Sequence, residues 1–348
     1  MAKLMRIGIV GCGVISDIHI KAILEIPDVK LVAVADINEN VAKAIAERCK
    51  CDWYTDFKEM IRRADIDIID ICTPSGLRKD IAVYAAENKK HIIAEKPIEV
   101  TIDRIDEILE ACSRNKVFIS GIFNKRYKDI YQQIRNIVTQ GRLGRLIFAD
   151  VSMKWYRPSE YYKNSSWRGT WALDGGGALM NQCIHYVDIL QWLVGPVENV
   201  FGQTDKLVHT YIETEDTAAA LIRFKCGAMG TIQAATSTYP GFSAKFSLHG
   251  ENGGIIVEDD RVIDFKFKEK YPGDETLFGD ESNQVNAGAS TNIVTNYELH
   301  KRQLTSIISS LRQGKEPEIS GNEARKAVEI IEAIYRSASE KKLITLPL

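Results

Sequence analysis

The first third of the chain alternates short apolar runs with segments of helical periodicity. A short apolar run without polar interruptions is typical of a strand that is buried on both faces of a sheet. The segments between the runs, such as residues 81–86 and 102–111, have the spacing of crossover helices. This alternation predicts a doubly wound parallel α/β sheet in a first domain of residues 1–122. The expected strands lie at residues 6–10, 31–35, 66–71, 91–94 and 117–120.

The rest of the chain, residues 123–348, changes to runs in which apolar and polar positions alternate. This period predicts a second α/β domain with an open, largely antiparallel sheet. Because an open sheet leaves one face uncovered, that face is a candidate for self-association. Two late helices are expected at residues 296–312 and 322–341, of which the last could pack back on the first domain, and a surface loop is expected at residues 271–291. The expected strands are residues 146–155, 217–224, 228–235, 245–249 and 254–258.

Charge and cysteine content narrow the class of partner. The 348 residues contain 45 Lys and Arg against 47 Asp and Glu, which gives a net charge of −2. This balance argues against nucleic acid or an anionic membrane as a partner and favours a small molecule. Seven cysteines, scattered and odd in number, predict reduced thiols and a cytoplasmic location. We expect no secretory leader and no membrane span, because no run approaches the roughly 18–20 apolar residues that a span needs.

A glycine-rich turn follows the first expected strand, where residues 8–16 read Gly-Ile-Val-Gly-Cys-Gly-Val-Ile-Ser. Gly11 permits a tight turn, and Gly13 lets the backbone approach a pyrophosphate at the N-terminus of the next helix. A plain strand-to-helix turn is the alternative. The context favours a Rossmann-type dinucleotide site, with cofactor contacts expected from Gly11, Cys12, Gly13, Val14 and Ile15.

Two further positions lie where a dinucleotide would be bound. Asp36 ends the second expected strand, where a carboxylate accepts the ribose hydroxyls of NAD and repels the 2′-phosphate of NADP. Capping of the helix that starts near Glu39 is the alternative for Asp36. Thr73, Pro74 and Ser75 follow the third strand at the ligand-binding edge, and they either contact the cofactor or cap the next helix. We expect NAD as the cofactor.

A lysine follows the fourth expected strand in the sequence Glu95-Lys96-Pro97. A partly desolvated ammonium at this edge of the sheet could exchange a proton with a reacting hydroxyl. By itself, a lysine beside a proline is usually a surface residue. Because the second domain offers a matching helix, we predict that Lys96 is catalytic and that Glu95 and Lys96 both lie at the cofactor.

A glycine run, residues 175–177, leads into that helix. Asn181, His185 and Asp188 follow at i, i+4 and i+7, and these spacings share one helix face. The glycines let a ligand or another backbone approach closely. Asn181 can hydrogen-bond a substrate, and His185 is predicted to be catalytic beside Lys96, although a lone helical histidine is otherwise a core residue. We expect no metal site, because asparagine is a poor transition-metal ligand and no second histidine is near.

An aromatic and basic stretch, residues 155–171, precedes this helix. Exposed aromatic rings suit sugar stacking, and guanidinium groups form paired hydrogen bonds with carboxylate or phosphate. A loop that aromatic anchors hold in place is the alternative. Residues 123–127 follow the last parallel strand and offer similar groups. We expect substrate contacts from Asn181, Arg126, Tyr156, Arg157, Tyr162 and Thr170, and a cofactor contact from Asn124.

Together these residues resemble the Gfo/Idh/MocA family of nicotinamide-dependent sugar and polyol oxidoreductases over nearly the whole chain. The glycine turn, Glu95-Lys96-Pro97 and the helix with Asn181 and His185 occur in the order and spacing of the family. The resemblance implies a Rossmann domain, a C-terminal α/β domain that assembles through its open antiparallel sheet as a homodimer or homotetramer, and Lys96 and His185 at the reacting centre. Many members of the family have aspartate where this chain has Asn181.

Residues 167–171, Trp-Arg-Gly-Thr-Trp, followed by Gly-Gly-Gly-Ala-Leu-Met-Asn, resemble one branch of that family, the UDP-N-acetyl-2-amino-2-deoxyglucuronate 3-dehydrogenases. The resemblance implies oxidation at C3 of a nucleotide-linked sugar such as UDP-N-acetylglucosaminuronate. It also implies that Trp167 and Arg168 lie beside the cofactor, often in a loop shared between subunits. Two other hypotheses stay open: a myo- or scyllo-inositol or free-aldose dehydrogenase of the same family, and a non-catalytic NAD-binding sensor. The presence of both Lys96 and His185 argues against the sensor.

Overall fold

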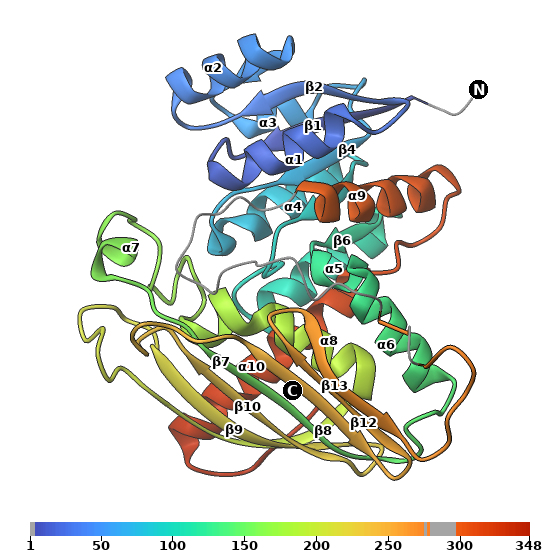
Figure 1. Ribbon diagram of the computed structural model, residues 1–348. Helices are drawn as coiled ribbons and strands as arrows, with labels where there is room; N and C mark the ends of the chain where they lie inside the picture. The colour runs from blue at the N-terminus through green and yellow to red at the C-terminus, as the bar shows by residue number, and fades with distance from the viewer. Residues whose placement is uncertain (1–3, 275–276, 279–296) are drawn as a thin grey trace. The chain divides into compact units, whose positions relative to one another are not determined.

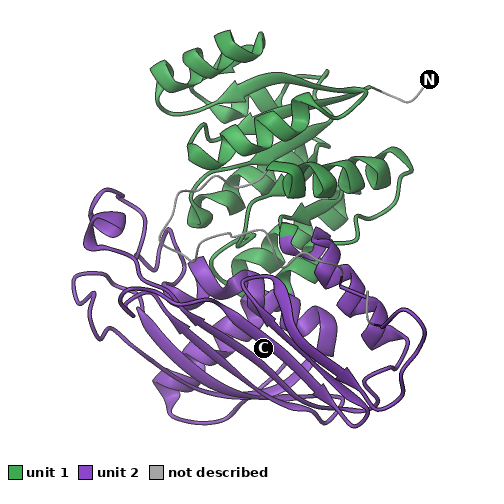
Figure 2. Cartoon of the chain, viewed as in Figure 1, with its two compact units in different colours: residues 1–124, 294–325 green, residues 125–293, 326–348 purple. Residues whose placement is uncertain are grey.

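The computed structural model describes residues 4–274, 277–278 and 297–348. The chain forms two compact units (Figure 2). Unit 1 consists of Met1–Asn124 and Val294–Arg325, and unit 2 of Lys125–Ile293 and Lys326–Leu348. A division was expected at residue 122 with a possible return of the last helix to the first domain; in the structure the chain returns to unit 1 through residues 294–325, which contain the helix expected at residues 296–312. Most of the loop expected at residues 271–291 lies outside the described residues.

Unit 1 contains the parallel sheet that the apolar runs predict (Figure 1). All of its paired strands run parallel, in the spatial order β3-β2-β1-β4-β5-β6, so the predicted doubly wound sheet is confirmed. The short edge strand β3 was not expected, because its three residues are polar or partly exposed and show no apolar run. The strands are β1 (Met5–Val10), β2 (Val29–Ala35), β3 (Asp52–Tyr54), β4 (Ile68–Ile71), β5 (His91–Ala94) and β6 (Ile119–Gly121).

Helices cover both faces of this sheet. On one face, α9 contacts α1, and its buried positions Leu304, Ile307, Ile308 and Leu311 form one helical stripe in the core beside β1 and β2. This packing is the reason that α9 belongs to unit 1. On the other face, α4 packs beside α3 and α5. The helical segments of unit 1 are α1 (Val14–Leu24), α2 (Glu39–Cys49), α3 (Phe57–Ile61), η1 (Ser75–Leu77), α4 (Arg78–Glu87), α5 (Ile102–Asn115) and α9 (Tyr297–Arg312).

Unit 2 is built on an eight-stranded sheet in the order β13-β12-β11-β7-β10-β9-β8-β14. Every neighbouring pair is antiparallel except β7 and β10, so the expected open, largely antiparallel sheet is confirmed. Buried and exposed residues alternate along β9, which shows that one face of the sheet is uncovered in the single chain. The strands are β7 (Leu146–Lys154), β8 (Val197–Asp205), β9 (Thr217–Phe224), β10 (Met229–Ala235), β11 (Lys245–Gly250), β12 (Gly253–Glu258), β13 (Arg261–Phe267) and β14 (Ile344–Thr345).

Three helical segments of unit 2 pack against the other face of that sheet. The helix α8 contacts β7, the preceding turn η3 contacts β9 and β10, and α10 approaches β8 so closely that a Cβ at Gly202 would lie 2.7 Å from Ile334. No helix within the described ranges is long and apolar enough to span a membrane. The helical segments are η2 (Asn124–Tyr127), α6 (Asp129–Thr139), α7 (Ser159–Lys163), η3 (Ala178–Cys183), α8 (Ile184–Val194) and α10 (Gly321–Glu340), whose first turn belongs to unit 1.

Candidate active site

The glycine turn of unit 1 is shaped for close approach. Gly11 has φ +93°, and a Cβ there would lie 2.8 Å from the backbone nitrogen of Thr73, so both conformation and space require glycine. A Cβ at Gly13 would meet nothing within 4 Å. Gly13 precedes the first residue of α1, where unpaired N–H groups favour an anion. The open space above this turn therefore fits a pyrophosphate.

Asp36 is held against the same turn by the backbone. Its Oδ2 accepts the N–H of Cys12 at 2.8 Å, and its Oδ1 accepts the N–H of Asn38 at 2.8 Å. The residue that caps α2 is Asn38, whose side chain accepts from Asn40 and Val41. Capping of this helix is therefore excluded as the role of Asp36, which stands beside the dinucleotide turn.

A buried arginine joins the ends of β4 and β5. Arg78 is 5% exposed, and its guanidinium donates to the carbonyls of Thr73 at 2.7 Å, Glu95 at 2.5 Å and Pro97. These bonds link the segment of Thr73, Pro74 and Ser75 to the segment of Lys96. Ser75 is buried at the start of η1, while Thr73 and Pro74 are half-buried. The sequence offered no motif that marks Arg78, because its acceptors are backbone carbonyls.

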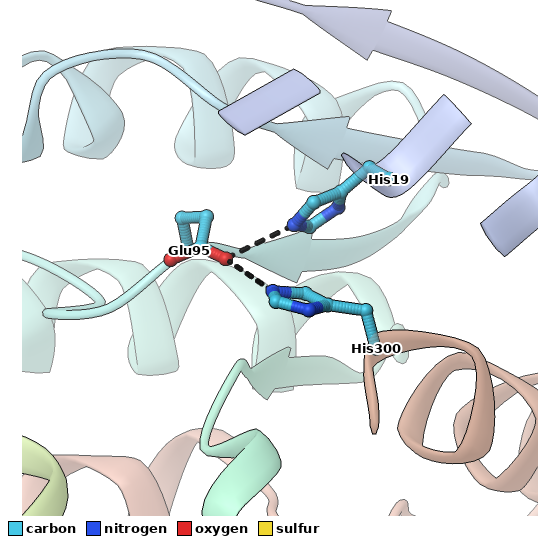
Figure 3. A group of neighbouring side chains, drawn as sticks. All are labelled: His19, Glu95 and His300. Carbon is cyan, nitrogen blue, oxygen red and sulfur yellow. Dashed lines mark hydrogen bonds and ion pairs between the residues drawn. The ribbon is translucent and has the colours of Figure 1, made fainter. Parts of the chain in front are cut away.

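The carboxylate of Glu95 lies inside unit 1, between two histidines (Figure 3). Its Oε1 lies 3.0 Å from His19 Nε2 and 3.5 Å from His300 Nε2, and its Oε2 accepts the N–H of Lys96 at 2.9 Å. His19 Nδ1 contacts Asp70 at 2.7 Å. Glu95 was expected at the cofactor, but its side chain is committed to these groups. It holds the backbone from which the half-buried Lys96 projects.

The charges of this cluster stabilise one another. Burial opposes ionisation of Glu95, but the hydrogen bonds from His19 and His300 outweigh burial and hold the pKa of Glu95 well below its usual range. Burial likewise opposes the imidazolium form of His19, yet the Asp70 carboxylate raises the pKa of His19 well above its usual range. Such side chains can also hold zinc. Because both nitrogens of His19 contact carboxylates at hydrogen-bond distance, we interpret the cluster as a buried ion and hydrogen-bond network.

Asn124 extends the network at the end of unit 1. Its Nδ2 lies 3.1 Å from His300 Nδ1. Asn124 was expected to contact the cofactor, and this bond fixes the amide at the carboxyl end of β6. The network thus joins residues that lie 176 positions apart in sequence, which no local pattern could indicate.

In unit 2, the predicted site helix begins with a π-helical turn. Residues 178–183 form this turn, η3, and α8 follows directly. A π turn pairs residues i and i+5, so positions before and after it do not keep the α-helical face assumed from the sequence. Asn181 and His185 are half-buried, whereas Asp188 is fully buried. The three side chains therefore do not form one exposed face.

Asp188 pairs with Arg126, which corrects the expected role of that arginine. The guanidinium of Arg126 binds both oxygens of Asp188 at 2.7 and 2.5 Å and stacks on Trp192. Arg126 is 2% exposed and Asp188 0%. A buried bidentate pair leaves the guanidinium committed, so Arg126 stabilises unit 2 and is not proposed as a substrate contact.

A chain of amides and carboxylates fixes Asn181. Its Nδ2 donates to Asp174 at 2.5 Å, and its Oδ1 accepts from Gln182 at 2.8 Å. Asp174 also accepts the N–H of Gly169 at 2.8 Å. Gln182 was not singled out from the sequence, yet it further contacts the hydroxyl of Tyr161 and the guanidinium of Arg157. Asn181 is thus linked directly to the aromatic and basic stretch.

Within that stretch, rings and guanidinium groups alternate. Arg157 lies over Trp155 and Tyr161, at 5.2 and 5.3 Å from the ring centroids. Arg168 lies over Tyr161 and Trp167, at 4.3 and 5.3 Å. Burial lowers the pKa of Arg157 from its ordinary value. We call residues 155–168 with this arrangement the cation–aromatic loop.

Two expected substrate residues of this region serve the packing of unit 2. Tyr162 is 5% exposed, hydrogen-bonds Thr236 at 2.8 Å, and packs against His209. It is therefore an anchor of the loop, as the alternative interpretation held. The hydroxyl of Thr170 donates to the carbonyl of Trp167 at 2.7 Å and so shapes the turn. Tyr156 is half-buried, with its ring against Tyr239.

The family of the chain follows from comparison with known proteins. Residues 5–122 match the NAD-binding Rossmann fold of the oxidoreductase family, and residues 131–256 match the Gfo/Idh/MocA C-terminal domain. The chain belongs to the Gfo/Idh/MocA family. The resemblance inferred from the motifs is confirmed, and the chain is an oxidoreductase with NAD as its cofactor.

Relatives and solved structures cover nearly the whole chain. The WlbA dehydrogenase of Bordetella pertussis, solved with NADH and UDP-GlcNAcA, is 34% identical with a TM-score of 0.90, and the match covers 99% of both chains. The WlbA dehydrogenase of Chromobacterium violaceum, solved with the same ligands, is 31% identical with a TM-score of 0.90, covering 100% of this chain and 97% of the other. Inositol 2-dehydrogenase of Rhizobium meliloti is 27% identical over 98% of this chain and 99% of its own. The comparisons support a sugar or inositol dehydrogenase without selecting between these substrates.

Proposed function

We propose that the chain oxidises C3 of a nucleotide-linked sugar such as UDP-N-acetylglucosaminuronate, with NAD as the hydride acceptor. The cation–aromatic loop carries this proposal. Arg157 and Arg168 stack on one ring, Tyr161, and no carboxylate of the described chain pairs with Arg168. A half-buried guanidinium without an acidic partner favours an anionic ligand such as a diphosphate or a uronate. The similarity to the two WlbA dehydrogenases supports the same class of ligand.

The residues of unit 1 fit the cofactor. The open space at Gly13 suits a pyrophosphate, and Asp36 offers a carboxylate for the ribose hydroxyls. Ile37 is 96% exposed and Leu77 47% exposed at the carboxyl ends of β2 and β4, where apolar side chains could flank a base. Bound NAD supplies a carbon that accepts hydride.

The proposed proton chemistry uses Lys96 and His185. Lys96 takes the proton of the reacting hydroxyl at Nζ, and its backbone is held by Glu95 and Arg78. His185 assists this transfer through its imidazole. Asn181 orients a sugar hydroxyl through its amide, which Asp174 and Gln182 hold in place. Tyr156 and Thr170 are proposed as further substrate contacts, and Trp167 as a neighbour of the cofactor.

A second candidate is an inositol or free-aldose dehydrogenase. The relative from Rhizobium meliloti favours it, since that enzyme acts on an inositol and matches over the full length of this chain. The neutral amides of Asn181 and Gln182 would also suit the hydroxyls of an uncharged polyol. The two candidates differ in what they require of the cation–aromatic loop.

The deciding experiment measures binding and turnover of UDP-N-acetylglucosaminuronate and of myo-inositol by Arg157→Ala and Arg168→Ala variants. Loss of a charge-assisted hydrogen bond costs about 1.5–3 kcal/mol, so the dissociation constant of the charged ligand should rise about 10- to 150-fold. Arg145→Ala is the matched control, because Arg145 is exposed and pairs with Glu251 at the surface. Unchanged binding of the nucleotide sugar by both variants, or wild-type turnover of neutral polyols only, would contradict the proposal in favour of the second candidate.

We also propose that the uncovered sheet face forms a dimer or tetramer interface. Leu221 and Phe201 are opposite each other on β9 and β8 and are 55% and 39% exposed. Met229 adds a further exposed apolar side chain on β10. Light scattering should give a multiple of the chain mass, and Leu221→Glu should reduce it to the monomer because a carboxylate would be buried without a partner. A monomeric wild type would contradict this assembly.

A further inference from the structure

A buried carboxylate faces the glycine run of the site helix. Glu215 is 3% exposed, and its Oε2 accepts the N–H of Gly177 at 2.9 Å. Its Oε1 accepts the N–H of Leu179 at 2.8 Å and the hydroxyl of Tyr335 at 2.9 Å. Its backbone carbonyl accepts the N–H of Ala178 at 3.1 Å. One residue therefore holds the start of the π turn by three backbone donors.

We call Glu215, with its three bonds to the backbone of residues 177–179 and its bond to Tyr335, the Glu215 clamp. This clamp requires glycine at positions 176 and 177. A Cβ at Gly177 would lie 1.8 Å from the carbonyl oxygen of Glu215, and a Cβ at Gly176 would lie 2.2 Å from the hydroxyl of Tyr335. No side chain fits at either position. Approach by another backbone thus accounts for Gly177, and the packing of the Tyr335 side chain accounts for Gly176.

The clamp is connected to Asn181. The N–H of Asn181 donates to the carbonyl of Gly177 at 3.0 Å, so the residue that Glu215 holds also fixes the backbone of Asn181. The π turn then leads without interruption into α8 and His185. A short π segment in an α-helix is frequent at functional sites, and here its first residues depend on one carboxylate.

We propose that Glu215 is a positioning residue for the reaction: its ionised carboxylate holds the first turn of the site helix, and protonation of that carboxylate within the folded protein weakens its bonds to the turn and displaces Asn181 and His185. The inference rests on the proposed role of these two residues. A carboxylate can accept all three of its donors, whereas a carboxylic acid must use one oxygen to donate and leaves a buried N–H or hydroxyl without an acceptor.

The groups around Glu215 place the pKa of its carboxyl group in the neutral range. No cation of the described residues forms an ion pair with Glu215. The other groups that face it are Tyr335 on α10, Cys183 on η3 and Tyr162 on α7, with Asp174 beside Tyr335. Burial raises the pKa of Glu215 to about 7, against the opposing effect of the bonds from Leu179, Gly177 and Tyr335. The neighbouring Asp216 is bonded to the backbone of residues 207–209.

The first test is the pH profile of kcat/KM for UDP-N-acetylglucosaminuronate at saturating NAD in the full-length enzyme. We expect kcat/KM of the wild type to fall below pH 7, and we call this fall the acid limb of the profile. Glu215→Gln should lack the acid limb, and its kcat/KM at pH 8 should be roughly tenfold lower than that of the wild type. Tyr335→Phe removes one donor to the ionised carboxylate, so the midpoint should move upward by about one pH unit. Glu213→Gln is the matched control, because Glu213 is exposed, lies two residues away and accepts a single backbone N–H.

The second test needs no substrate. Hydrogen exchange of the peptide covering residues 175–185, corrected for the intrinsic pH dependence, should be slow at pH 8 and rise by pH 6 in the wild type. In Glu215→Gln it should be raised equally at both pH values. Absence of turnover with every sugar would refute the proposed function alone, and the exchange result would still decide the role of Glu215. A limb that persists in Glu215→Gln with its midpoint unchanged, or exchange that is the same in both proteins, would overturn the inference.

Discussion

Two buried glutamates, one in each unit, hold the segments that carry the proposed catalytic residues. Their surroundings shift the pKa of the two carboxyl groups in opposite directions. Glu95 accepts the N–H of Lys96 and lies between His19 and His300, which hold its pKa well below the usual range against the effect of burial. Glu215 accepts only neutral donors, so burial prevails and raises its pKa to about 7. A buried carboxylate stays ionised near neutrality when cations compensate it, and it becomes titratable when only dipoles do.

The two carboxylates hold the proposed catalytic residues in two different ways. The backbone of Lys96 rests on the Glu95 carboxylate, which His19 and His300 keep ionised across the neutral range. The first turn before Asn181 rests on a group that changes state in this range. We therefore expect variants of the two glutamates to differ in stability, in pH dependence and in their effect on activity.

The largest effect should come from the residue that Glu95 holds. Lys96→Met removes the proposed proton acceptor, so kcat should fall by about 10²- to 10⁴-fold. A fluorescence titration should show the dissociation constant of NADH changed by no more than about threefold, because the cofactor turn and Asp36 are unaltered. Lys89→Met is the control, since Lys89 lies on the same unit and contacts Asn115 at the surface. Near-normal turnover of Lys96→Met would contradict the proposed role of Lys96 as proton acceptor and, with it, the role of Glu95 in positioning Lys96.

The next effect concerns folding at pH 8. Glu95→Gln leaves His19 with only one carboxylate partner in a buried site, and breaking such a pair costs about 3–5 kcal/mol of unfolding free energy. Glu215→Gln replaces a buried charge that has no cation partner, so its unfolding free energy should stay unchanged or rise. Urea denaturation of both variants measures the difference. Equal losses would show that the two carboxylates are not distinguished by their partners.

The pH dependence of folding should have opposite signs for the two groups. Glu215 has a folded pKa raised from 4.5 to about 7, so the native state binds the extra proton and the stability due to this group falls as pH rises from 4.5 to 7. The full window corresponds to about 3 kcal/mol. The stability that Glu95 contributes is instead present above its usual pKa and is lost as pH falls through its lowered folded pKa.

The measurement is the difference in unfolding free energy between the wild type and Glu215→Gln, at pH 5 and at pH 8. The variant should gain about 2–3 kcal/mol relative to the wild type over this interval. Contributions from the other titratable groups are common to both proteins and cancel in the difference. A difference that does not depend on pH would contradict the raised pKa of Glu215.

The smallest effect concerns a third carboxylate, which faces a ligand rather than a buried partner. Asp36 is half-buried at the glycine turn, where a 2′-phosphate would meet its charge. Titration calorimetry should give NAD at least roughly tenfold tighter binding than NADP, which corresponds to about 1.4 kcal/mol. Asp36→Ala should narrow the ratio, and Asp56→Ala, which alters a helix cap in the same unit, should not. Equal dissociation constants in the wild type would contradict the assignment.

The sequence by itself determined the parts that local patterns encode. Uninterrupted apolar runs indicated five of the six parallel strands, and alternation indicated the central strands of the second sheet, because burial on one or two faces leaves a period in the chain. Gly11 could be identified because its turn needs a conformation that other residues avoid. The strands β3, β8, β13 and β14 were missed, since they are short or lie toward the sheet edges and carry no such period.

Only the tertiary structure decided which partners the polar side chains have. Arg126 reads as a ligand-binding cation, but packing buries it with Asp188, 62 positions away. His19, Glu95 and His300 read as isolated residues, but three elements bring them together. The helix with Asn181 and His185 reads as α-helical, but it begins as a π turn that Glu215 and Tyr335 hold. Periodicity describes which face of an element is buried, and it contains no information about the charge or dipole that a distant element places against that face.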